Sequence, residues 1–509
     1  MSRLIIVFVV STLLISCGDS SIEIPAYEKD FCSLIHDDDS ISLSQEMESF
    51  KDSMQKKTGV YVLEDGGTAM ISRAWLTEHA EKTIDIQYFI FATDNVGLIA
   101  VDYLVRAADR GVKVRILIDD ILVDAGSHEI LLLDSHENIE IRIYNPGINV
   151  GKSITQKITK FATDFIESNK RMHNKTFIVD DKVAITGGRN VADEYFDYDH
   201  EYNFRDRDVF LMGKVVEKMN ASFDEFWQHR LSVPVGNLFD EKEQIKPHKG
   251  QFDRLHQYAC NPENYWPQVR EKMKSLPTAF KNIVDSGELI WVDSVDFISD
   301  HPGKNENPEL LVGGKSTSAL MELINSANET IDIQSPYFIT TAIGKKLFAD
   351  AIKRGVKIRI LTNSLASTDN IEAFSGYQRD REEILKLGIR VFEFKPDAKE
   401  RFKVMTGELQ KTLNYAPIFG LHAKTMVVDG KVAVIGTFNL DPRSAHINTE
   451  CVSIIHSNKI ADKVLKEMEI EFSSDNSWET TLNFNPDHLS TTKKQIKAVT
   501  RKIIPKEIL

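Results

Sequence analysis

The sequence predicts an α/β protein made of two α/β/α sandwich halves that are related by a pseudo-two-fold axis. Stretches with strand and helix patterns alternate along the chain, which is typical of a sheet covered by helices on both faces. This order occurs twice and no more, which favours a duplicated domain over a solenoid. Each copy ends in the same motif, HNKTFIVDDKVAITGGRN at 173–190 and HAKTMVVDGKVAVIGTFN at 422–439.

The first half is predicted to cover residues 56–290. It begins with a helix over 69–80, where Met70, Ile71, Ala74 and Trp75 have helical spacing. The elements expected next are a strand at 83–90, a helix with Leu98, Val101, Val105 and Ala108 on one face, a strand at 112–119, a helix near 128–134 and a strand at 139–145. Asp119 and Asp120 end the second of these strands, where they fit a functional site and a simple turn equally well.

The second half, predicted at 291–475, repeats this order. A helix carries Leu320, Leu323, Ile324 and Ala327, and TIDIQSPYFI at 330–339 restates TIDIQYFI of the first half. The stretches VKIRILTN and GIRVFEFKP restate VKVRILID and NIEIRIYNP in the same way. Residues 476–509 form a polar extension with a basic end, which is expected to be a solvated helix or a contact with lipid headgroups.

Each motif is predicted to be a β-hairpin that carries a polar site at one end. Side chains at positions i and i+2 share one face of a strand, so His173 and Lys175 point the same way. The turn dipeptides Asp180-Asp181 and Asp429-Gly430 reverse the chain in the two copies. The return strand then brings Asn190 towards the histidine and lysine of its own motif. An imidazole, an ammonium group and an amide together suit an oxyanion, and two facing sets supply a nucleophile and an acid for a phosphodiester.

The repeated HxKxxxxD, followed by GGxN or GTxN, resembles the signature of the phospholipase D superfamily. The flanks GGRNVADEYF and FNLDPRSAHINTE are similar to the bacterial cardiolipin synthase branch, especially its class C type. This resemblance covers about residues 55–475. It implies two phospholipase D-like halves and a phosphatidyltransferase that makes cardiolipin from two phospholipids through a phosphohistidine.

The resemblance also implies roles for single residues. His173 is expected to be the nucleophile and His422 the acid, and the near symmetry of the sequence leaves the reverse assignment open. Glu450 matches a glutamate that bonds to the motif histidine, and Asp206 is its rough counterpart in the first half. The full expected site is His173, Lys175, Asp180, Asn190, His422, Lys424, Asp429, Asn439 and Glu450, with both motif aspartates in supporting places at the turns. No metal or other cofactor is expected.

Two other activities remain open for the same motif. A phospholipase D hydrolase would use water as the acceptor and release phosphatidic acid, and the choice depends on how well the site excludes water. A phosphodiesterase or nuclease is less compatible with the net charge of −14, since nucleic-acid binders usually carry a basic surface. No nucleic-acid partner is therefore expected. An accessory protein is neither indicated nor excluded.

The N-terminus predicts export and membrane attachment. Arg3 precedes an apolar run that ends at Cys17, as in a signal peptide over residues 1–17. The last four residues of this run, LISC, resemble the lipobox of bacterial lipoproteins, which implies acylation of Cys17 and a place in the cell envelope, facing the periplasm or the exterior. A plain cleaved signal peptide is the alternative. Residues 18–55 are expected to form a tether and one helix.

The remaining cysteines are predicted to be free thiols. A Cys32–Cys260 disulfide would require an oxidising compartment, and no spacing in the sequence favours it. Cys451 lies in an apolar run and is expected to be buried. Three lysines before the first motif, Lys152, Lys157 and Lys160, are expected to be a solvated face rather than phosphate ligands.

Overall fold

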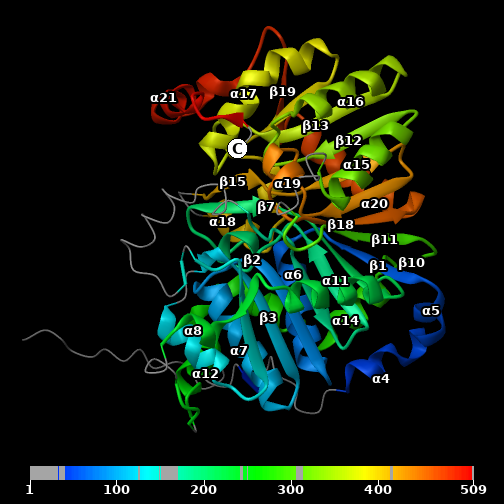
Figure 1. Ribbon diagram of the computed structural model, residues 1–509. Helices are drawn as coiled ribbons and strands as arrows, with labels where there is room; N and C mark the ends of the chain where they lie inside the picture. The colour runs from blue at the N-terminus through cyan, green and yellow to red at the C-terminus, as the bar shows by residue number, and fades with distance from the viewer. Residues whose placement is uncertain are drawn as a thin grey trace, which may run out of the picture.

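The computed structural model describes residues 32–33, 41–123, 126–147, 149–150, 170–240, 245–248, 250–304, 313–412, 416–506 and 509. Cys17, Lys152, Lys157 and Lys160 lie outside these ranges, so the predictions about them stay predictions. The described chain forms two large sheets, one above the other in Figure 1 and each flanked by helices. A third, two-stranded sheet takes one strand from each half.

The first half supplies the lower sheet. Its elements are α4 (Leu43–Met47), α5 (Lys51–Lys56), β1 (Thr58–Leu63), α6 (Gly66–His79), β2 (Thr83–Phe91), α7 (Asn95–Asp109), β3 (Lys113–Val123), α8 (Ser127–Asp134), β4 (Ile139–Tyr144), β5 (Thr176–Val179), β6 (Val183–Gly187), β7 (Tyr202–Arg205), β8 (Asp208–Gly213), α11 (Val216–Gln228), β9 (Ser232–Pro234), α12 (Asp253–Ala259), α13 (Pro267–Met273), α14 (Ala279–Asp285) and β10 (Ile290–Val292). The strand order in the sheet is β10-β1-β8-β6-β5-β2-β3-β4-β9.

The second half supplies the upper sheet. Its elements are β11 (Val295–Ser299), α15 (Lys315–Ser326), β12 (Thr330–Gln334), α16 (Ala342–Lys353), β13 (Lys357–Asn363), α17 (Ile371–Lys386), β14 (Arg390–Phe394), α18 (Gly407–Thr412), β15 (Ile418–Leu421), β16 (Thr425–Val428), β17 (Val432–Gly436), α19 (Pro442–His446), β18 (Cys451–His456), α20 (Asn458–Phe472), β19 (Ser477–Thr480) and α21 (Thr492–Arg501). The strand order is β11-β18-β17-β16-β12-β13-β14-β19.

The two sheets share one topology, which confirms the predicted duplication. The order β1-β8-β6-β5-β2-β3-β4 in the first half matches β11-β18-β17-β16-β12-β13-β14 in the second. In both halves the strands before the motif pair in parallel, while the motif hairpin is antiparallel to them. The carboxyl ends of these parallel strands meet the histidine end of the hairpin, where sites in such sheets gather.

A buried ion pair on the inner face of each sheet is also duplicated. Arg115 of β3 donates to Asp85 of β2 at 2.6 Å, and Arg359 of β13 donates to Asp332 of β12 at 2.5 Å. Each arginine also donates to a carboxylate on the long helix that packs on the sheet. This carboxylate belongs to Asp224 on α11 in the first half and to Glu469 on α20 in the second. Strand and helix are thereby locked in the same arrangement twice.

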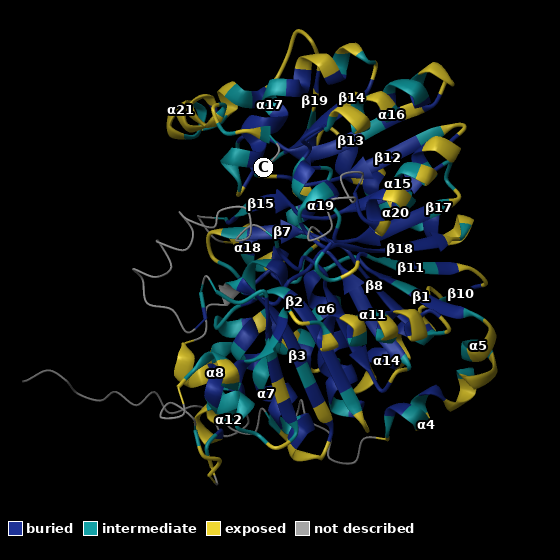
Figure 2. Cartoon of the chain, viewed as in Figure 1, coloured by how far each residue is buried: buried dark blue, intermediate teal, exposed yellow. Residues whose placement is uncertain are grey.

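The apolar core has three parts, and the middle part joins the halves. Most strand residues are buried, while many exposed residues lie on the outer helices (Figure 2). One core packs α6 and α7 on the lower sheet, and another packs α15, α16 and α17 on the upper sheet. The central core takes residues of both sheets together with α11 and α20. Because each buried leucine- or phenylalanine-sized side chain stabilises the fold by about 1.5–3 kcal/mol, this shared core holds the halves together.

Backbone pairing between the halves positions the site. β7 of the first half pairs in parallel with β15 of the second, from Tyr202↔Ile418 to Arg205↔Leu421. Met172 forms the corresponding isolated bridge with Thr449. These two contacts lie immediately before the two motif histidines, so the pairing fixes both histidines relative to the opposite half.

Three features differ from what the sequence suggests. Cys32 and Cys260 form a disulfide, so the prediction of free thiols there is wrong; Cys451 is free and buried as predicted. The strand expected over 330–339 ends at Gln334, because Pro336 cannot donate to a ladder. The polar extension contributes β19, which pairs with β14 at the edge of the upper sheet. Among the described residues, no helix is both long and apolar enough to cross a membrane.

Candidate active site

Each motif folds into the predicted hairpin. In the first, Asp180 and Asp181 have φ values of 51° and 57°, and in the second Asp429 and Gly430 have 52° and 61°. Positive φ at both central positions matches the twist of the flanking strands and closes a tight reversal. The strand face then sets the direction of the histidine and lysine that precede each hairpin.

The two motif aspartates are structural. The Asp180 carboxylate accepts backbone N–H groups of Glu81, Lys82 and Thr83 at 2.7–2.9 Å. Asp429 accepts the equivalent bonds from residues 328–330 at 2.8–3.2 Å. Each turn follows its histidine by seven residues, with a four-residue strand between them, so the turn lies at the far end of the strand from the histidine. The aspartates therefore fasten the hairpins to the starts of β2 and β12 and do not line the site.

The motif histidines are oriented by carboxylates from the opposite half. His173 Nδ1 lies 2.8 Å from Glu450 Oε2, and His422 Nδ1 lies 2.6 Å from Asp206 Oδ2. A carboxylate at Nδ1 keeps the proton on that nitrogen and leaves a lone pair on Nε2. Neither half holds its own histidine, so the site exists only when both halves pack together.

Burial keeps both imidazoles neutral in the resting protein. It lowers the pKa of His173 to about 4, with Lys175 and Lys424 adding repulsion against the attraction of Glu450. Burial likewise lowers the pKa of His422 to about 3, and the Lys424 charge adds to the effect. Neutral imidazoles with a fixed tautomer are suited to attack phosphorus, and an incoming phosphate anion favours protonation of one of them.

The motif lysines are buried beside the histidines. Lys175 Nζ donates to His173 O at 2.8 Å, and Lys424 Nζ donates to His422 O at 2.5 Å. Burial lowers the pKa of Lys175 to about 8. Burial and, among the nearby charges, the repulsion of Lys175 lower the pKa of Lys424 to about 7. Two ammonium groups that repel each other at the centre of the molecule form a site for a doubly contacted anion.

The histidine of each motif lies close enough to the lysine of the other motif for the lysine charge to change its pKa. Lys424 of the second half acts on the pKa of His173, and Lys175 of the first half acts on the pKa of His422. The ring of Tyr195, from the first half, meets the His422 ring edge to face with centroids 5.0 Å apart. The structure therefore brings five of the nine residues expected from the sequence to one site between the halves: His173, Lys175, His422, Lys424 and Glu450.

The two motif asparagines are held differently. Asn190 accepts the backbone N–H of Ile90 at 3.1 Å through its side-chain oxygen. Asn439 is buried, and its side-chain oxygen has no partner. The difference follows from Pro336, which interrupts the strand that would otherwise continue as β2 does.

The carboxylate Glu450 is itself held by a buried network. Thr437 and Ser444 donate hydroxyl groups to its two oxygens at 2.5 and 2.8 Å. Its backbone N–H donates to Asp300 at 3.0 Å, and Lys304 ties Asp300 to the loop around α19 at 2.8–2.9 Å. These hydrogen bonds fix the orientation of the Glu450 carboxylate relative to His173. The residues of the network support Glu450 and are not assigned to contact with a phosphate.

Asp206 occupies the same place in the first half and was only a rough counterpart of Glu450 in the sequence. A Cβ built on Gly188 would lie 2.1 Å from Asp206 Oδ1, so glycine is required there by close approach. Against the effect of burial, the contact with His422 and the charges of Lys424 and Arg189 hold the pKa of Asp206 far below its usual range. The recurrence of an acidic residue 33 and 28 positions after the two motif histidines is the signal that identifies it.

The other expected residues have structural places. Asp119 accepts the backbone N–H of Met172 at 2.8 Å and so positions the segment that leads to His173. Asp120 accepts backbone N–H groups from residues 147–150. Among the described residues, no group of three or more histidine, cysteine, aspartate or glutamate side chains is arranged to hold a metal ion.

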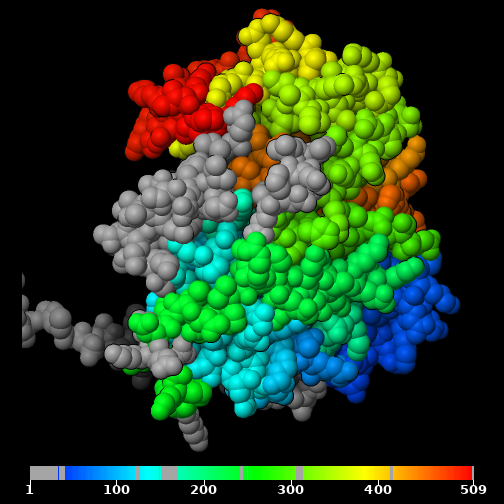
Figure 3. Space-filling view, viewed as in Figure 1, coloured from blue at the N-terminus to red at the C-terminus, as the bar shows by residue number. Residues whose placement is uncertain are grey.

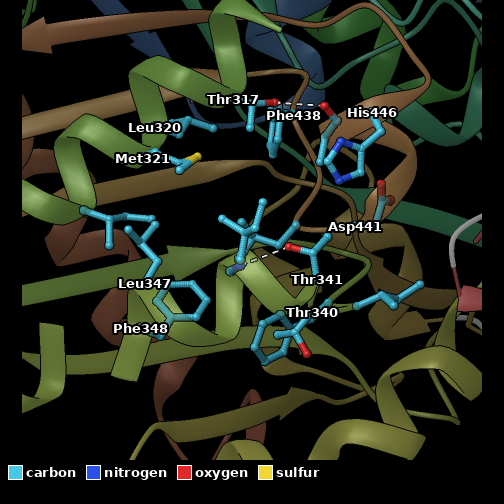
Figure 4. A pocket seen from close by; sticks show the side chains of 17 residues that line it. Thr317, Leu320, Met321, Thr340, Thr341, Leu347, Phe348, Phe438, Asp441 and His446 are labelled. Atoms are coloured by element: carbon cyan, nitrogen blue, oxygen red, sulfur yellow. Dashed lines mark hydrogen bonds between the residues drawn. The ribbon is translucent and has the colours of Figure 1, made fainter. Parts of the chain in front are cut away.

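An apolar pocket borders the loop that carries Asn439 (Figure 4). Its walls come from α15, α16 and the loop after β17; they include Leu320, Met321, Leu347, Phe348 and Phe438, with Asp441 and His446 at one side. The first half has a pocket at the equivalent place between α6 and α7, where Phe196 and Met273 contribute to the lining. A phosphate site and an apolar pocket thus lie on either side of one loop.

The comparisons with known proteins agree with this geometry. The family model described as "Cardiolipin synthase, PLD-like domain" matches residues 76–227 and again 320–472. The chain is 35% identical to cardiolipin synthase C of Escherichia coli (strain K12) over 446 residues, covering 84% of this chain and 87% of that protein. It is 33% identical to an uncharacterised protein of Helicobacter pylori (strain ATCC 700392 / 26695), covering 82% and 79% of the two chains.

A solved structure has the same fold at low identity. The crystal structure of phosphatidylserine synthase from Haemophilus influenzae Rd KW20 superposes with a TM-score of 0.57 at 12% identity, covering 91% of this chain and all of that one. The duplicated match, the shared fold and the identity over most of the chain agree with the paired motifs described above. The chain belongs to the cardiolipin synthase family of phospholipase D-like enzymes.

Proposed function

We propose that the protein is a phosphatidyltransferase that forms cardiolipin from two phospholipids through a phosphohistidine. The observation that carries this proposal is the exchange of carboxylates between the halves, which orients two neutral imidazoles towards one pair of buried ammonium groups. The identity to cardiolipin synthase C supports the choice of substrates. The apolar pocket beside the Asn439 loop suits a molecule that has a phosphate and a hydrocarbon part.

In the first step, His173 Nε2 attacks the phosphorus of the donor lipid. The bond from phosphorus to the headgroup oxygen breaks. His422, which is protonated at Nε2 when the phosphate anion of the donor binds, gives this proton to the leaving alcohol. The ammonium groups of Lys175 and Lys424 hold the nonbridging oxygens, whose negative charge grows along the reaction. Asn190 and Asn439 are assigned to the same oxygens through their amide N–H groups.

In the second step, His422 is neutral and acts as the base. It takes the proton of a hydroxyl on the acceptor lipid, and the acceptor oxygen attacks the phosphorus. The bond to His173 breaks, which restores the free imidazole and leaves cardiolipin. We assign the nucleophilic role to His173 and the acid role to His422, which is the order expected for the two motifs.

The test is incubation of the full chain with defined phospholipids, followed by mass analysis of the products. With phosphatidylglycerol supplied, cardiolipin and a released alcohol are the expected products. Phosphatidic acid without cardiolipin would show that water is the acceptor and that the protein is a hydrolase. Cleavage of DNA in a gel assay, with phospholipids left intact, would replace both readings by a nuclease.

We also propose that the protein is a lipoprotein of the bacterial cell envelope, acylated at Cys17 and facing the periplasm or the exterior. The Cys32–Cys260 disulfide supports this, because disulfides persist in oxidising compartments and are rare in the cytosol. Metabolic labelling with a fatty acid is expected to mark the protein. Loss of the label in Cys17→Ser protein supports acylation there, and its persistence would place the anchor elsewhere.

A further inference from the structure

The exposed apolar side chains of the described chain concentrate near the C-terminus. Of the nine large hydrophobic residues that are exposed, six lie between residues 482 and 503: Leu482, Phe484, Leu489, Ile496, Val499 and Ile503. Ile496 and Val499 are each 60% exposed and Ile503 is 87% exposed. Figure 2 shows α21 as a mostly exposed helix at the edge of the upper half. A cluster of exposed apolar side chains of this kind marks a surface that binds another protein or a membrane.

The inner face of α21 is fixed to the body. Ala498 is fully buried, and Lys494 Nζ donates to the carbonyl oxygens of Ala366 and Thr368 at 2.9 and 3.0 Å. Arg501 is paired with Glu372 of α17 at 3.0 Å. At 100° per residue, these three positions leave Ile496 and Val499 on the opposite face of α21, and Ile503 lies in the turn that follows the helix. The apolar stripe is therefore held outward by contacts on the other side of the helix.

Basic residues flank this stripe. Residues 491–506 contain five lysines, one arginine and no aspartate or glutamate, in a chain whose net charge is −14. Lys493 and Lys497 are exposed and lie beside Ile496 on the helical surface. We call Leu489, Lys493, Ile496, Lys497, Val499 and Ile503 together the C-terminal patch. In Figure 3 the segment that carries this patch projects from the upper part of the molecule.

The patch is one loop away from the active site. The carbonyl groups that hold Lys494 belong to the loop after β13, and the Ser367 carbonyl of the same loop accepts the hydroxyl group of Tyr202. Asp369, in this loop, accepts a hydrogen bond from the hydroxyl group of Tyr337 at 2.7 Å. Its charge also raises the pKa of Lys424, against the larger effect of burial. The loop therefore borders the phosphate site on one side and supports α21 on the other.

We propose that the C-terminal patch binds the surface of an anionic phospholipid bilayer and brings the rim of the active site against it. Apolar residues beside lysines on one helical face are typical of helices that lie in a membrane interface. The charge complements anionic headgroups, whereas the acidic remainder of the protein does not. The choice of phospholipid as the ligand rests on the proposed function. The alternative occupant is a second copy of this chain, which would have to place an acidic surface against the lysines of the patch.

The test is hydrogen–deuterium exchange of the full chain with vesicles, because it reports on α21 separately from any N-terminal anchor. Vesicles of phosphatidylglycerol mixed with phosphatidylcholine are compared with vesicles of phosphatidylcholine alone. The amides of residues 491–503 are expected to be protected by the anionic vesicles only. Equal protection by both vesicle types, or by neither, would overturn the proposal. Protection that appears without vesicles and grows with protein concentration would assign the patch to self-association and overturn it too.

Two sets of variants separate the charge from the apolar stripe. Lys493→Gln/Lys497→Gln is expected to weaken vesicle protection about 30-fold, which corresponds to about 2 kcal/mol. Ile496→Ser/Ile503→Ser is expected to abolish protection, and the exposure of both side chains means that the fold is unaffected. Ile41→Ser, which is 49% exposed, and Lys353→Gln on α16 are the matched controls and should bind as the unmodified chain does.

The outcome is independent of turnover. A chain that is protected by anionic vesicles but forms no cardiolipin would keep the patch and overturn the proposed function. A chain that converts dispersed short-chain phospholipids but shows no vesicle protection would keep the proposed function and overturn the assignment of the patch. Retention of full vesicle protection in Ile496→Ser/Ile503→Ser protein would also overturn the assignment of this surface.

Discussion

The two motifs differ at eight of their eighteen positions, and one of these differences is matched by their carboxylate partners. The first motif has Gly188 where the second has Thr437. Gly188 leaves room for Asp206 to approach, whereas Thr437 donates its hydroxyl group to Glu450 at 2.5 Å. In the second motif, the Thr437 hydroxyl group links the motif to Glu450. In the first motif, Gly188 lets Asp206 lie directly against the backbone. Duplication has thus conserved the place of the carboxylate while changing how it is held.

The same comparison extends to the surroundings of the two carboxylates. Asp206 lies among cations, and its neighbours Arg205 and Arg207 both bind Glu64. Glu450 is held by neutral hydroxyl groups and a backbone bond to Asp300. A carboxylate among cations resists protonation, which suits a partner that must stabilise an imidazolium. Both carboxylates have pKa values below the usual range, and they reach this through different neighbours.

The largest expected effect comes from removing either imidazole. His173→Ala and His422→Ala should each lower cardiolipin formation by about 10⁴-fold, because the groups act as one unit. The two variants should differ with a donor lipid that has a good leaving group: His422→Ala still forms the phosphohistidine, and His173→Ala does not. Product analysis and intact-protein mass measure both effects. His301→Ala, at an exposed histidine paired with Glu225, is the matched control. Adduct formation in His173→Ala alone would reverse the roles.

The next effect concerns the lysines and the dependence on pH. Lys175→Met or Lys424→Met should lower the rate by about 10²–10³-fold, as for loss of one donor to a developing oxyanion. In the unmodified protein, the pKa values of about 8 and about 7 mean that the lysines lose their protons as pH rises through that range. Activity at limiting substrate should therefore fall above pH 7–8, and it should fall again in acid as the histidines, with pKa values near 3–4, become protonated.

The arginine variants identify the alkaline limb. Lys424→Arg keeps the charge at high pH, so the limb should move upward in a profile of kcat/KM, even if the overall rate is lower. A limb that stays in place in both Lys424→Arg and Lys175→Arg would show that another group controls it.

The sequence predicted the fold and most of the site for physical reasons. Turn dipeptides at Asp180 and Asp429, with apolar runs on either side, suffice to define the hairpins and the faces of their strands. The sequence identified Glu450 and, roughly, Asp206 as carboxylate partners. That each serves the histidine of the opposite half could not be predicted, because it depends on how β7 and β15 pair across the halves. The disulfide was missed for a similar reason: Cys32 and Cys260 are 228 positions apart and meet only through packing.

A smaller effect is expected from exchanging the two ways of holding a carboxylate. Gly188→Thr alone should lower activity about 100-fold, because its side chain would strike Asp206. Thr437→Gly should cost about tenfold through the lost bond to Glu450. The double exchange Gly188→Thr/Asp206→Glu rebuilds the second arrangement in the first half and should be more active than Gly188→Thr. A double variant that loses activity additively would show that the two positions are not a unit.

The smallest effect on activity is expected from the disulfide. Cys32→Ser/Cys260→Ser should lower the free energy of unfolding by about 2–4 kcal/mol and leave turnover nearly unchanged, since the bridge joins the N-terminal segment to α12 away from the pocket. Thermal unfolding with and without reductant measures this. Reductant should shift the unmodified protein and not the variant, and a loss of activity with unchanged stability would contradict the assignment.

The central claim is that two motifs make one reaction centre. Intact-protein mass spectrometry after rapid quenching with a labelled donor phospholipid tests it most directly, because it counts covalent adducts per chain. We expect one phosphatidyl adduct per chain, lost when the nucleophilic histidine is replaced. Two adducts on one chain, on His173 and His422 together, would show two independent sites and contradict the account.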